Sequence, residues 1–242
     1  MDITSDTHSQ HISNQFNQEL EALKTHLMAM GGLVEKQVQD AISALLEGDS
    51  RLAEQVRDND TAVNDMQLRI DEECTRVLAR RQPAASDLRL VLAVIRATSD
   101  LERIGDEANK IARNALALAE SGRSARGFVE VRHISEHVRG MVRDALTAFA
   151  RFDTELALKV VREDDAVDSE YTSAMRSLVT FMMEDPRSIT SILSVMWILR
   201  ALERIGDHAD NLAEYVIYLV KGLDIRHSDV GTLDEQGLGS KG

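Results

Sequence analysis

The hexapeptide Leu-Glu-Arg-Ile-Gly-Asp occupies Leu101–Asp106 and recurs unchanged at Leu202–Asp207, 101 positions later (202 − 101). Six identical residues in a row indicate that the chain contains a duplicated unit. Each copy contains Glu-x-x-x-Asp, a spacing that places two carboxylates on one face of a helix. The repeat therefore predicts two equivalent structural units, each with a pair of acidic side chains.

The duplication extends well beyond the hexapeptide. Residues 40–64 match residues 144–168 at an offset of 104 positions (144 − 40), with identical or similar residues at Asp40, Asp49, Val56 and Val63. The offset falls to 101 at the hexapeptides, so the second copy is three residues shorter (104 − 101) between these points. The repeat therefore covers most of the chain.

Apolar residues recur at steps of three and four, which is the pattern of helices with one buried face. Gly48, Pro83 and Pro186 interrupt this pattern, since glycine and proline favour turns over helix interiors. The predicted helices are Phe16–Glu47, Ser50–Arg81, Ala84–Ser121, Val129–Phe152, Thr154–Met183 and Ser188–Gly222. Short connections favour antiparallel neighbours. The predicted fold class is all-α, with two tandem three-helix bundles related by internal duplication, as in spectrin-like repeats.

Four regions follow from this pattern. Residues 16–122 form the first predicted bundle and residues 127–223 the second, joined through Ser121–Ser124. The polar segment 1–15 and the glycine-containing tail 224–242 lack helical periodicity and are expected to be disordered.

Composition narrows the classes of function. The formal net charge is −13, from 41 acidic and 28 basic residues. This balance argues against a nucleic-acid-binding groove, which needs a concentrated basic patch, and suits contact with cations or basic surfaces. The single cysteine, Cys74, fits a reducing cytoplasm. No secretory leader and no apolar run of about 20 residues is recognised, so neither secretion nor membrane insertion is expected.

The helix before each hexapeptide supplies a second acidic pair. Asn64 lies 19 residues before Pro83 (83 − 64) and Glu102 lies 19 after it (102 − 83). Asp60 and Asp106 both lie 23 residues from the same proline (83 − 60, 106 − 83). If the two helices fold back antiparallel at this turn, the two pairs meet at one height.

The second half repeats this arrangement around Pro186. Asp168 lies 18 residues before it (186 − 168) and Glu203 lies 17 after it (203 − 186). Asp164 and Asp207 lie 22 before (186 − 164) and 21 after (207 − 186). Each half is therefore predicted to gather four carboxylate or amide oxygens on two neighbouring helices.

Clustered oxygen ligands suit Mg²⁺, Ca²⁺, Mn²⁺ or iron. Asn109 and Asp210 extend the two acidic stripes by about one turn. The candidate ligands are Asp60, Asn64, Glu102, Asp106 and Asn109 in the first half, and Asp164, Asp168, Glu203, Asp207 and Asp210 in the second. The second site is predicted to bind metal more tightly, because Asp168 and Asp210 stand where the first half has asparagines.

Plainer interpretations compete with this one. An acidic helix face is most often merely solvated. Gly105 and Gly206 are best explained by close helix packing, and His208, one position off the acidic stripe, is expected at the surface. No nucleophile–base pair and no phosphate-binding glycine loop is visible, so an enzyme is not the leading interpretation. Two alternatives remain: an all-α, Mg²⁺-dependent nucleotide pyrophosphohydrolase and a purely structural helical scaffold.

Three segments resemble a known family. Asp100–Asn109 and Ala201–Asp210, each built around the hexapeptide, are similar to the PhoU family of phosphate-uptake regulators, as is the turn Arg80–Arg89. The resemblance covers residues 14–222. It implies two tandem three-helix bundles, a homodimer, and metal clusters on Glu/Asp-x-x-x-Asp motifs, with iron, magnesium, manganese, calcium or zinc all open.

The resemblance also implies a role. A PhoU-like chain is a cytoplasmic, non-enzymatic negative regulator of phosphate uptake and of the Pho regulon, and so of phosphate homeostasis. It is expected to link a PstB-like ATPase subunit of the phosphate ABC transporter to a PhoR-like sensor histidine kinase. Through these partners it would lie peripherally at the membrane, and it would not bind nucleic acid.

Overall fold

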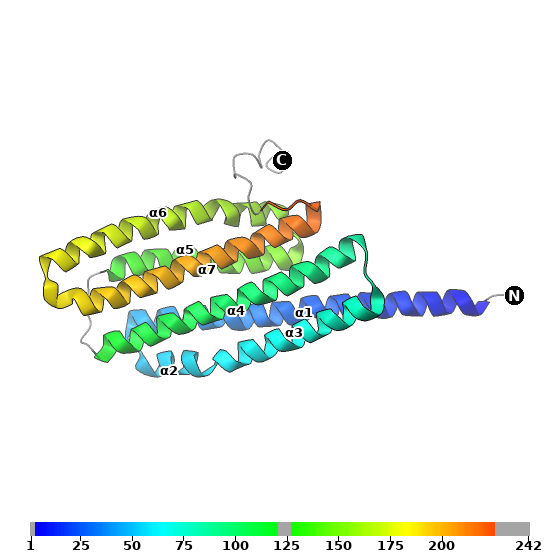
Figure 1. Ribbon diagram of the computed structural model, residues 1–242, viewed down its shortest axis with the longest axis horizontal. Coiled ribbons are helices and arrows are strands. Elements are labelled where there is room, and N and C mark those ends of the chain that lie inside the picture. Colours follow the sequence, from blue (N-terminus) through cyan, green and yellow to red (C-terminus); the bar gives the residue numbers. More distant parts are fainter. Residues whose placement is uncertain (1–2, 121–126, 226–242) are drawn as a thin grey trace.

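The computed structural model describes residues 3–120 and 127–225, and within these ranges all regular secondary structure is helical. The elements are α1 (Ile3–Glu47), α2 (Ser50–Asp58), α3 (Asp60–Arg81), α4 (Ala85–Glu120), α5 (Phe128–Arg151), α6 (Thr154–Glu184), the 3₁₀ turn η1 (Pro186–Ser188) and α7 (Ile189–Lys221). Helices α1–α4 form one half of the elongated molecule and α5–α7 the other (Figure 1). None of the described helices has the length and hydropathy needed to cross a membrane.

The duplication is visible at the helix caps. The Asp49 carboxylate accepts a hydrogen bond from the Leu52 amide and caps α2. The Asp153 carboxylate accepts hydrogen bonds from the Glu155 and Leu156 amides and caps α6. Aspartate at this position satisfies amide groups that the first helical turn leaves without partners. The two halves therefore start their second helices in the same way.

The predicted helix Ser50–Arg81 is interrupted in the structure. Asn59 ends α2, its amide donating to the Gln55 carbonyl, and α3 begins at the next residue. The sequence there is Asp58-Asn59-Asp60, three residues whose short polar side chains compete with helical hydrogen bonds. The equivalent of Asn59 in the second half is Glu163 (59 + 104), a better helix former, and α6 runs on without a break.

The N-terminal helix is longer than predicted. Helix α1 begins at Ile3, within the segment 1–15 that was expected to be disordered. That segment contains no proline or glycine, so nothing in it ends a helix. The linker residues 121–126 and the tail residues 226–242 lie outside the described residues. The predicted limits of the two bundles at the linker, and the predicted disorder of the tail, therefore stay predictions.

Helices α4 and α7 pack against each other in antiparallel orientation along the middle of the molecule (Figure 1). Arg89, near the start of α4, donates to the Leu219 carbonyl near the end of α7. Apolar side chains from both halves form one continuous core, which includes Leu101 and Ile104 of α4 and their equivalents Leu202 and Ile205 of α7. The hexapeptides therefore contribute their apolar residues to this core and leave their acidic residues on a flanking face.

Two adjacent glycines of α1 provide a test of the packing between the halves. A Cβ added to Gly31 would lie 2.5 Å from Leu146 Cδ2 of α5, whereas a Cβ on Gly32 meets nothing within 4 Å. We expect Gly32→Ala to raise the free energy of unfolding by about 0.5–1 kcal/mol, the helix preference of alanine over glycine. Gly31→Ala should gain less or lose stability, because Leu146 must move. Urea unfolding of the two variants measures this, and equal gains would contradict the packing of α1 on α5.

Candidate metal centre

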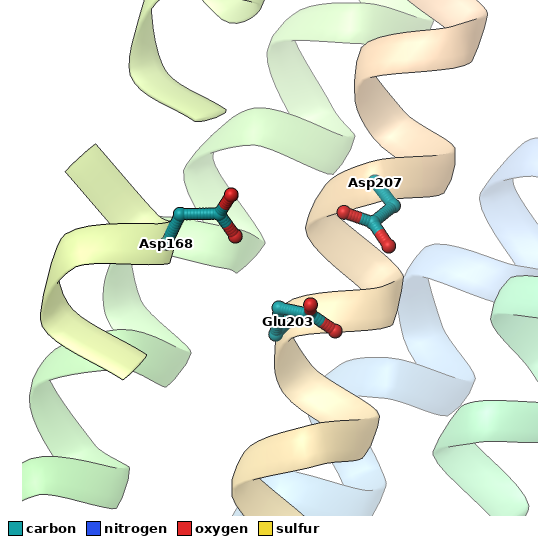
Figure 2. Close-up of side chains that lie close together, drawn as sticks. All are labelled: Asp168, Glu203 and Asp207. Carbon is teal, nitrogen blue, oxygen red and sulfur yellow. The ribbon is translucent and has the colours of Figure 1, made fainter. Parts of the chain in front are cut away.

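Three carboxylates of the second half come together between α6 and α7. Asp168, Glu203 and Asp207 each place one oxygen within 4.8 Å of the others. Figure 2 shows Glu203 and Asp207 on successive turns of α7, with Asp168 facing them from α6. The antiparallel return at Pro186 thus brings together side chains that lie far apart in sequence, as the spacing predicted.

Gly206 lies on α7 between the two carboxylates of its hexapeptide, where α6 passes close by. A Cβ added here would lie 3.6 Å from both Asp164 Oδ1 and Val167 Cγ1 of α6. These are ordinary van der Waals distances. Glycine therefore suits the close approach of α6 to α7, but the position does not strictly require it. The close packing of α6 on α7 explains Gly206, and the same packing places Asp164 beside the three-carboxylate group.

Burial gives the cluster its electrostatic character. Burial is the main factor that raises the pKa of Glu203 to about 7, and Asp207 adds to the effect. Asp164 is raised to a pKa of about 6 by burial and then by Asp207 and Asp168. The pKa of Asp207 is raised too, by burial first and then by Asp168. Close, partly desolvated carboxylates favour a bound proton or cation over the fully ionised state.

Asp210 lies outside the three-carboxylate group but belongs to the same charged region. Its pKa is raised to about 8, first by burial and then by Glu214, Asp164 and Asp207. The buried oxygens Glu203 Oε2, Asp164 Oδ1 and Asp210 Oδ1 have no hydrogen-bond partner in the described structure. Acceptors of this kind are rare in protein interiors, and a cation with its waters would satisfy them. The residues of the second half therefore fit a divalent or trivalent metal ion.

One cation of the protein already contacts this cluster. Arg200 donates to Glu203 Oε1 from one turn earlier on α7 and offsets part of its charge. Partial neutralisation by one arginine leaves Asp168, Asp207 and Asp164 to repel one another.

The structure places the predicted residues of the first half differently. Asn64 and Asp106 are exposed, Glu102 is partly exposed and Asn109 is buried. The Asp60 side chain lies outside the described residues, and the break at Asn59 directly precedes it. Among the described side chains, the group of three carboxylates with oxygens within 4.8 Å of one another is Asp168, Glu203 and Asp207, all from the second half. Metal binding by Asp60, Asn64, Glu102, Asp106 and Asn109 stays a prediction.

The first half also buries a polar side chain that sequence reasoning missed. Gln37 of α1 is buried with both amide atoms unpaired in the described structure. Its Oε1 would lie 3.2 Å from a Cβ added to Gly105, so Gly105 accommodates Gln37. At an offset of 104 the second half has Met141 (37 + 104). The sequence did contain a signal for this buried polar residue: Gln37 stands where the second half has the core residue Met141.

The expectation of a surface position for His208 was wrong. The residue is only 5% exposed, and its Nδ1 lies 2.8 Å from Asp100 Oδ1 of α4. Asp100 also accepts hydrogen bonds from Tyr215, at 2.7 Å, and Asn211, at 3.3 Å. We call Asp100, His208, Asn211 and Tyr215 the inter-bundle network. Helical periodicity within one bundle could not reveal it, because its partners belong to the other bundle.

Fold and site together define the class of protein: a duplicated all-α chain that carries a carboxylate cluster on a helix face. The PhoU domain model matches residues 27–115 and 131–216, one match in each half, and the chain belongs to the PhoU family.

Curated relatives and solved structures agree with this assignment. The chain is 63% identical over 225 residues to the phosphate-specific transport system accessory protein PhoU homolog of Pseudomonas putida, covering 93% of this chain and 88% of that protein. It is 46% identical over 227 residues to the accessory protein PhoU of Escherichia coli K12, covering 94% of each chain. The crystal structure of PhoU from Pseudomonas aeruginosa superposes with a TM-score of 0.85 at 62% identity, covering 86% of this chain and 100% of that one.

These comparisons confirm three predictions: the resemblance to the PhoU family, the all-α duplicated fold and the non-enzymatic class. The relatives are named accessory proteins of a phosphate-specific transport system, and a solved relative from Streptococcus pneumoniae is named a phosphate transport system regulatory protein. The chain is thus an accessory protein of phosphate transport.

Proposed function

We propose that the chain is a metal-containing adaptor that restrains phosphate uptake and phosphate-dependent signalling. Its relatives' names supply the link to phosphate transport and to regulation. The observation that carries the metal is the group of Asp168, Glu203 and Asp207, whose oxygens lie within 4.8 Å of one another and are only partly neutralised by Arg200.

In this proposal Asp168, Glu203 and Asp207 hold the ion, and Asp164 and Asp210 lie beside them. A bound cation supplies positive charge that offsets the repulsion among these carboxylates and links α6 to α7. Glu203, being buried, fixes the depth of the site, while Asp168 and Asp207 reach solvent and can adjust to the size of the ion. The first-half residues Asp60, Asn64, Glu102, Asp106 and Asn109 form a second, weaker site in the same proposal.

The adaptor role requires two kinds of partner. We propose the ATPase subunit of the phosphate ABC transporter and the sensor histidine kinase of the phosphate regulon, both contacted in the cytoplasm by a homodimer of this chain. Pull-down of each purified partner by this protein, at low and high phosphate, tests the role. Binding to neither partner at any phosphate concentration would contradict it.

Metal content gives the direct test of the site. Protein purified without chelator or affinity metal is expected to contain metal, and Glu203→Ala/Asp207→Ala is expected to lose the larger part of it, as measured by elemental analysis. The matched control is Glu102→Ala/Asp106→Ala, the same pair in the first hexapeptide, which should lose less. Equal losses would contradict the ranking of the two sites. Wild-type protein that neither contains nor takes up iron, Mn²⁺, Mg²⁺, Ca²⁺ or Zn²⁺ would contradict the metal itself.

A further inference from the structure

A groove on the surface between α4 and α7 lies beside the carboxylate cluster and shares Arg200 with it. It encloses a cavity of about 410 Å³. Helix α4 contributes Lys110 and Asn114 to its walls, and α7 contributes Trp197, Ala201 and Arg204. We call this cavity the Trp197 groove.

The groove exposes the only tryptophan of the chain. Trp197 is 65% exposed, although tryptophan is usually largely buried. On α7 it continues a stripe of partly exposed apolar residues with Ile189 and Leu193, at steps of four. A large aromatic side chain that the fold does not use for its own core is typical of binding surfaces.

The walls of the groove are cationic. Lys110 Nζ and Arg204 Nη1 both lie 2.9 Å from Glu107 Oε1, and Arg200 also lines the cavity. Glu107 is buried, whereas the three cationic side chains are 40–49% exposed. The carboxylate therefore holds two cations in place from beneath, and the surface that a partner meets is positive. With Glu107 and Glu203 counted against them, the three cations leave one positive charge (3 − 2) in a chain of net charge −13.

The internal duplication supplies a second copy of the same groove at the other end of the α4–α7 interface. At the offset of 101, Trp197 corresponds to Arg96, Ala201 to Asp100, and Tyr215 to Asn114. There the protein fills the space itself: Asp100 is 6% and Tyr215 is 7% exposed, and the Tyr215 hydroxyl donates to Asp100 Oδ2 at 2.7 Å. Arg96 lies 5.9 Å from the centroid of the Tyr215 ring.

The Trp197 groove is open because the residues that fill its counterpart are absent. Ala201 lacks the carboxylate of Asp100, and Asn114 is shorter than Tyr215. The filled copy shows what the two helices accept between them, namely one carboxylate together with one ring. The open copy has a carboxylate of its own, Glu107, beneath Lys110 and Arg204, but these two cations and Trp197 stay partly exposed around the cavity. A further carboxylate at this surface has to come from outside the chain.

We infer that the Trp197 groove binds an acidic segment of a partner protein, with a carboxylate on Lys110 and Arg204 and a neighbouring apolar side chain on Trp197. The biological role of this groove rests on the proposed adaptor function. The inference adds to that function one surface that contacts a partner. Exposed ion pairs contribute little singly, so the apolar contact with Trp197 provides most of the affinity. The cations select acidic partners and make binding sensitive to salt.

A displayed library of random peptides tests the inference on the full-length protein. Wild-type protein serves as the bait, and Lys110→Ala/Trp197→Ala serves for counter-selection. The enriched peptides are expected to combine Asp or Glu with an aromatic or aliphatic residue within one helical turn. Enrichment of basic or uncharged peptides, or no enrichment over the variant, would overturn the inference.

Affinity is then measured with a fluorescein-labelled peptide from the selection. We expect Trp197→Ala to weaken binding at least about tenfold and Lys110→Ala severalfold. Met183→Ala removes an apolar side chain outside the groove that is 80% exposed, and it should leave affinity unchanged. Circular dichroism establishes that each variant is folded. Equal affinity of wild type and Trp197→Ala would overturn the assignment, whatever the metal content of the protein.

Two further measurements distinguish a peptide from other occupants of the groove. Because Trp197 is the sole tryptophan, its fluorescence reports on the groove directly. Inorganic phosphate or ATP that changes this fluorescence and displaces the peptide at similar concentrations would identify a site for small anions instead. Sedimentation equilibrium in which Trp197→Ala converts a dimer to a monomer would identify a self-association surface. Neither effect is expected.

Discussion

Replacing Asp100 by alanine is expected to lower the free energy of unfolding by about 3–5 kcal/mol, the cost of breaking a buried polar pair. Asp100 accepts hydrogen bonds from Tyr215 and Asn211 and lies 2.8 Å from the His208 ring. Its loss leaves these groups without an acceptor in the interior, and a buried donor left unpaired costs about 1–3 kcal/mol. Urea or thermal unfolding followed by circular dichroism gives the magnitude.

The control for this prediction is Asp65→Ala, which removes an exposed carboxylate from α3. Exposed substitutions usually change stability by less than about 0.5 kcal/mol. Asp100→Asn retains an acceptor for the Tyr215 hydroxyl and should fall between the two. If Asp100→Ala and Asp65→Ala had the same effect, the inter-bundle network would contribute nothing to stability.

Raising the pH from 5 to 8 in metal-free buffer is expected to lower the free energy of unfolding by on the order of 3 kcal/mol. Folding raises the pKa of Asp164 to about 6, of Glu203 to about 7 and of Asp210 to about 8. Between pH 4 and pH 8 the folded protein therefore binds more protons than the unfolded chain. Stability is greatest below the unfolded pKa values and is lost as the pH rises through the folded ones.

Urea unfolding at a series of pH values provides the measurement. Glu203→Gln and Asp210→Asn should flatten the pH profile, because each removes one carboxylate that ionises at a cost, whereas Asp65→Asn should leave it unchanged. A metal that binds the cluster should restore stability at pH 8, by about 2.7 kcal/mol at a hundredfold excess over its dissociation constant. Stability that rises between pH 5 and pH 8 without metal would contradict the electrostatics of the cluster.

Most of the fold could be predicted because it depends on local and repeated signals. Apolar spacing defines the helices, proline and glycine mark their ends, and the aspartates at 49 and 153 cap equivalent helices. The break at Asn59 was missed because a helical pattern of apolar residues continues across it. There the low helix preference of Asp58-Asn59-Asp60 prevails over the periodicity.

The candidate site was predictable where it depends on two helices joined by one turn. Counting residues from Pro186 was enough to bring Asp168 to Glu203 and Asp207. The same count cannot give burial, which determines the raised pKa of Asp210. Nor can it place His208 beside Asp100, because that contact depends on how one bundle packs on the other.

The antiparallel packing of α4 on α7 has the geometry of a homodimer interface, in which each contact would occur twice by symmetry. A symmetric dimer must accept every side chain in both of its copies. Here the two copies are joined in one chain, so Asp100 and Ala201, at equivalent positions, could diverge. One copy of the interface could become a permanent seal while the other stayed available to a ligand. Internal duplication of this kind separates the stability of an interface from its capacity to evolve recognition.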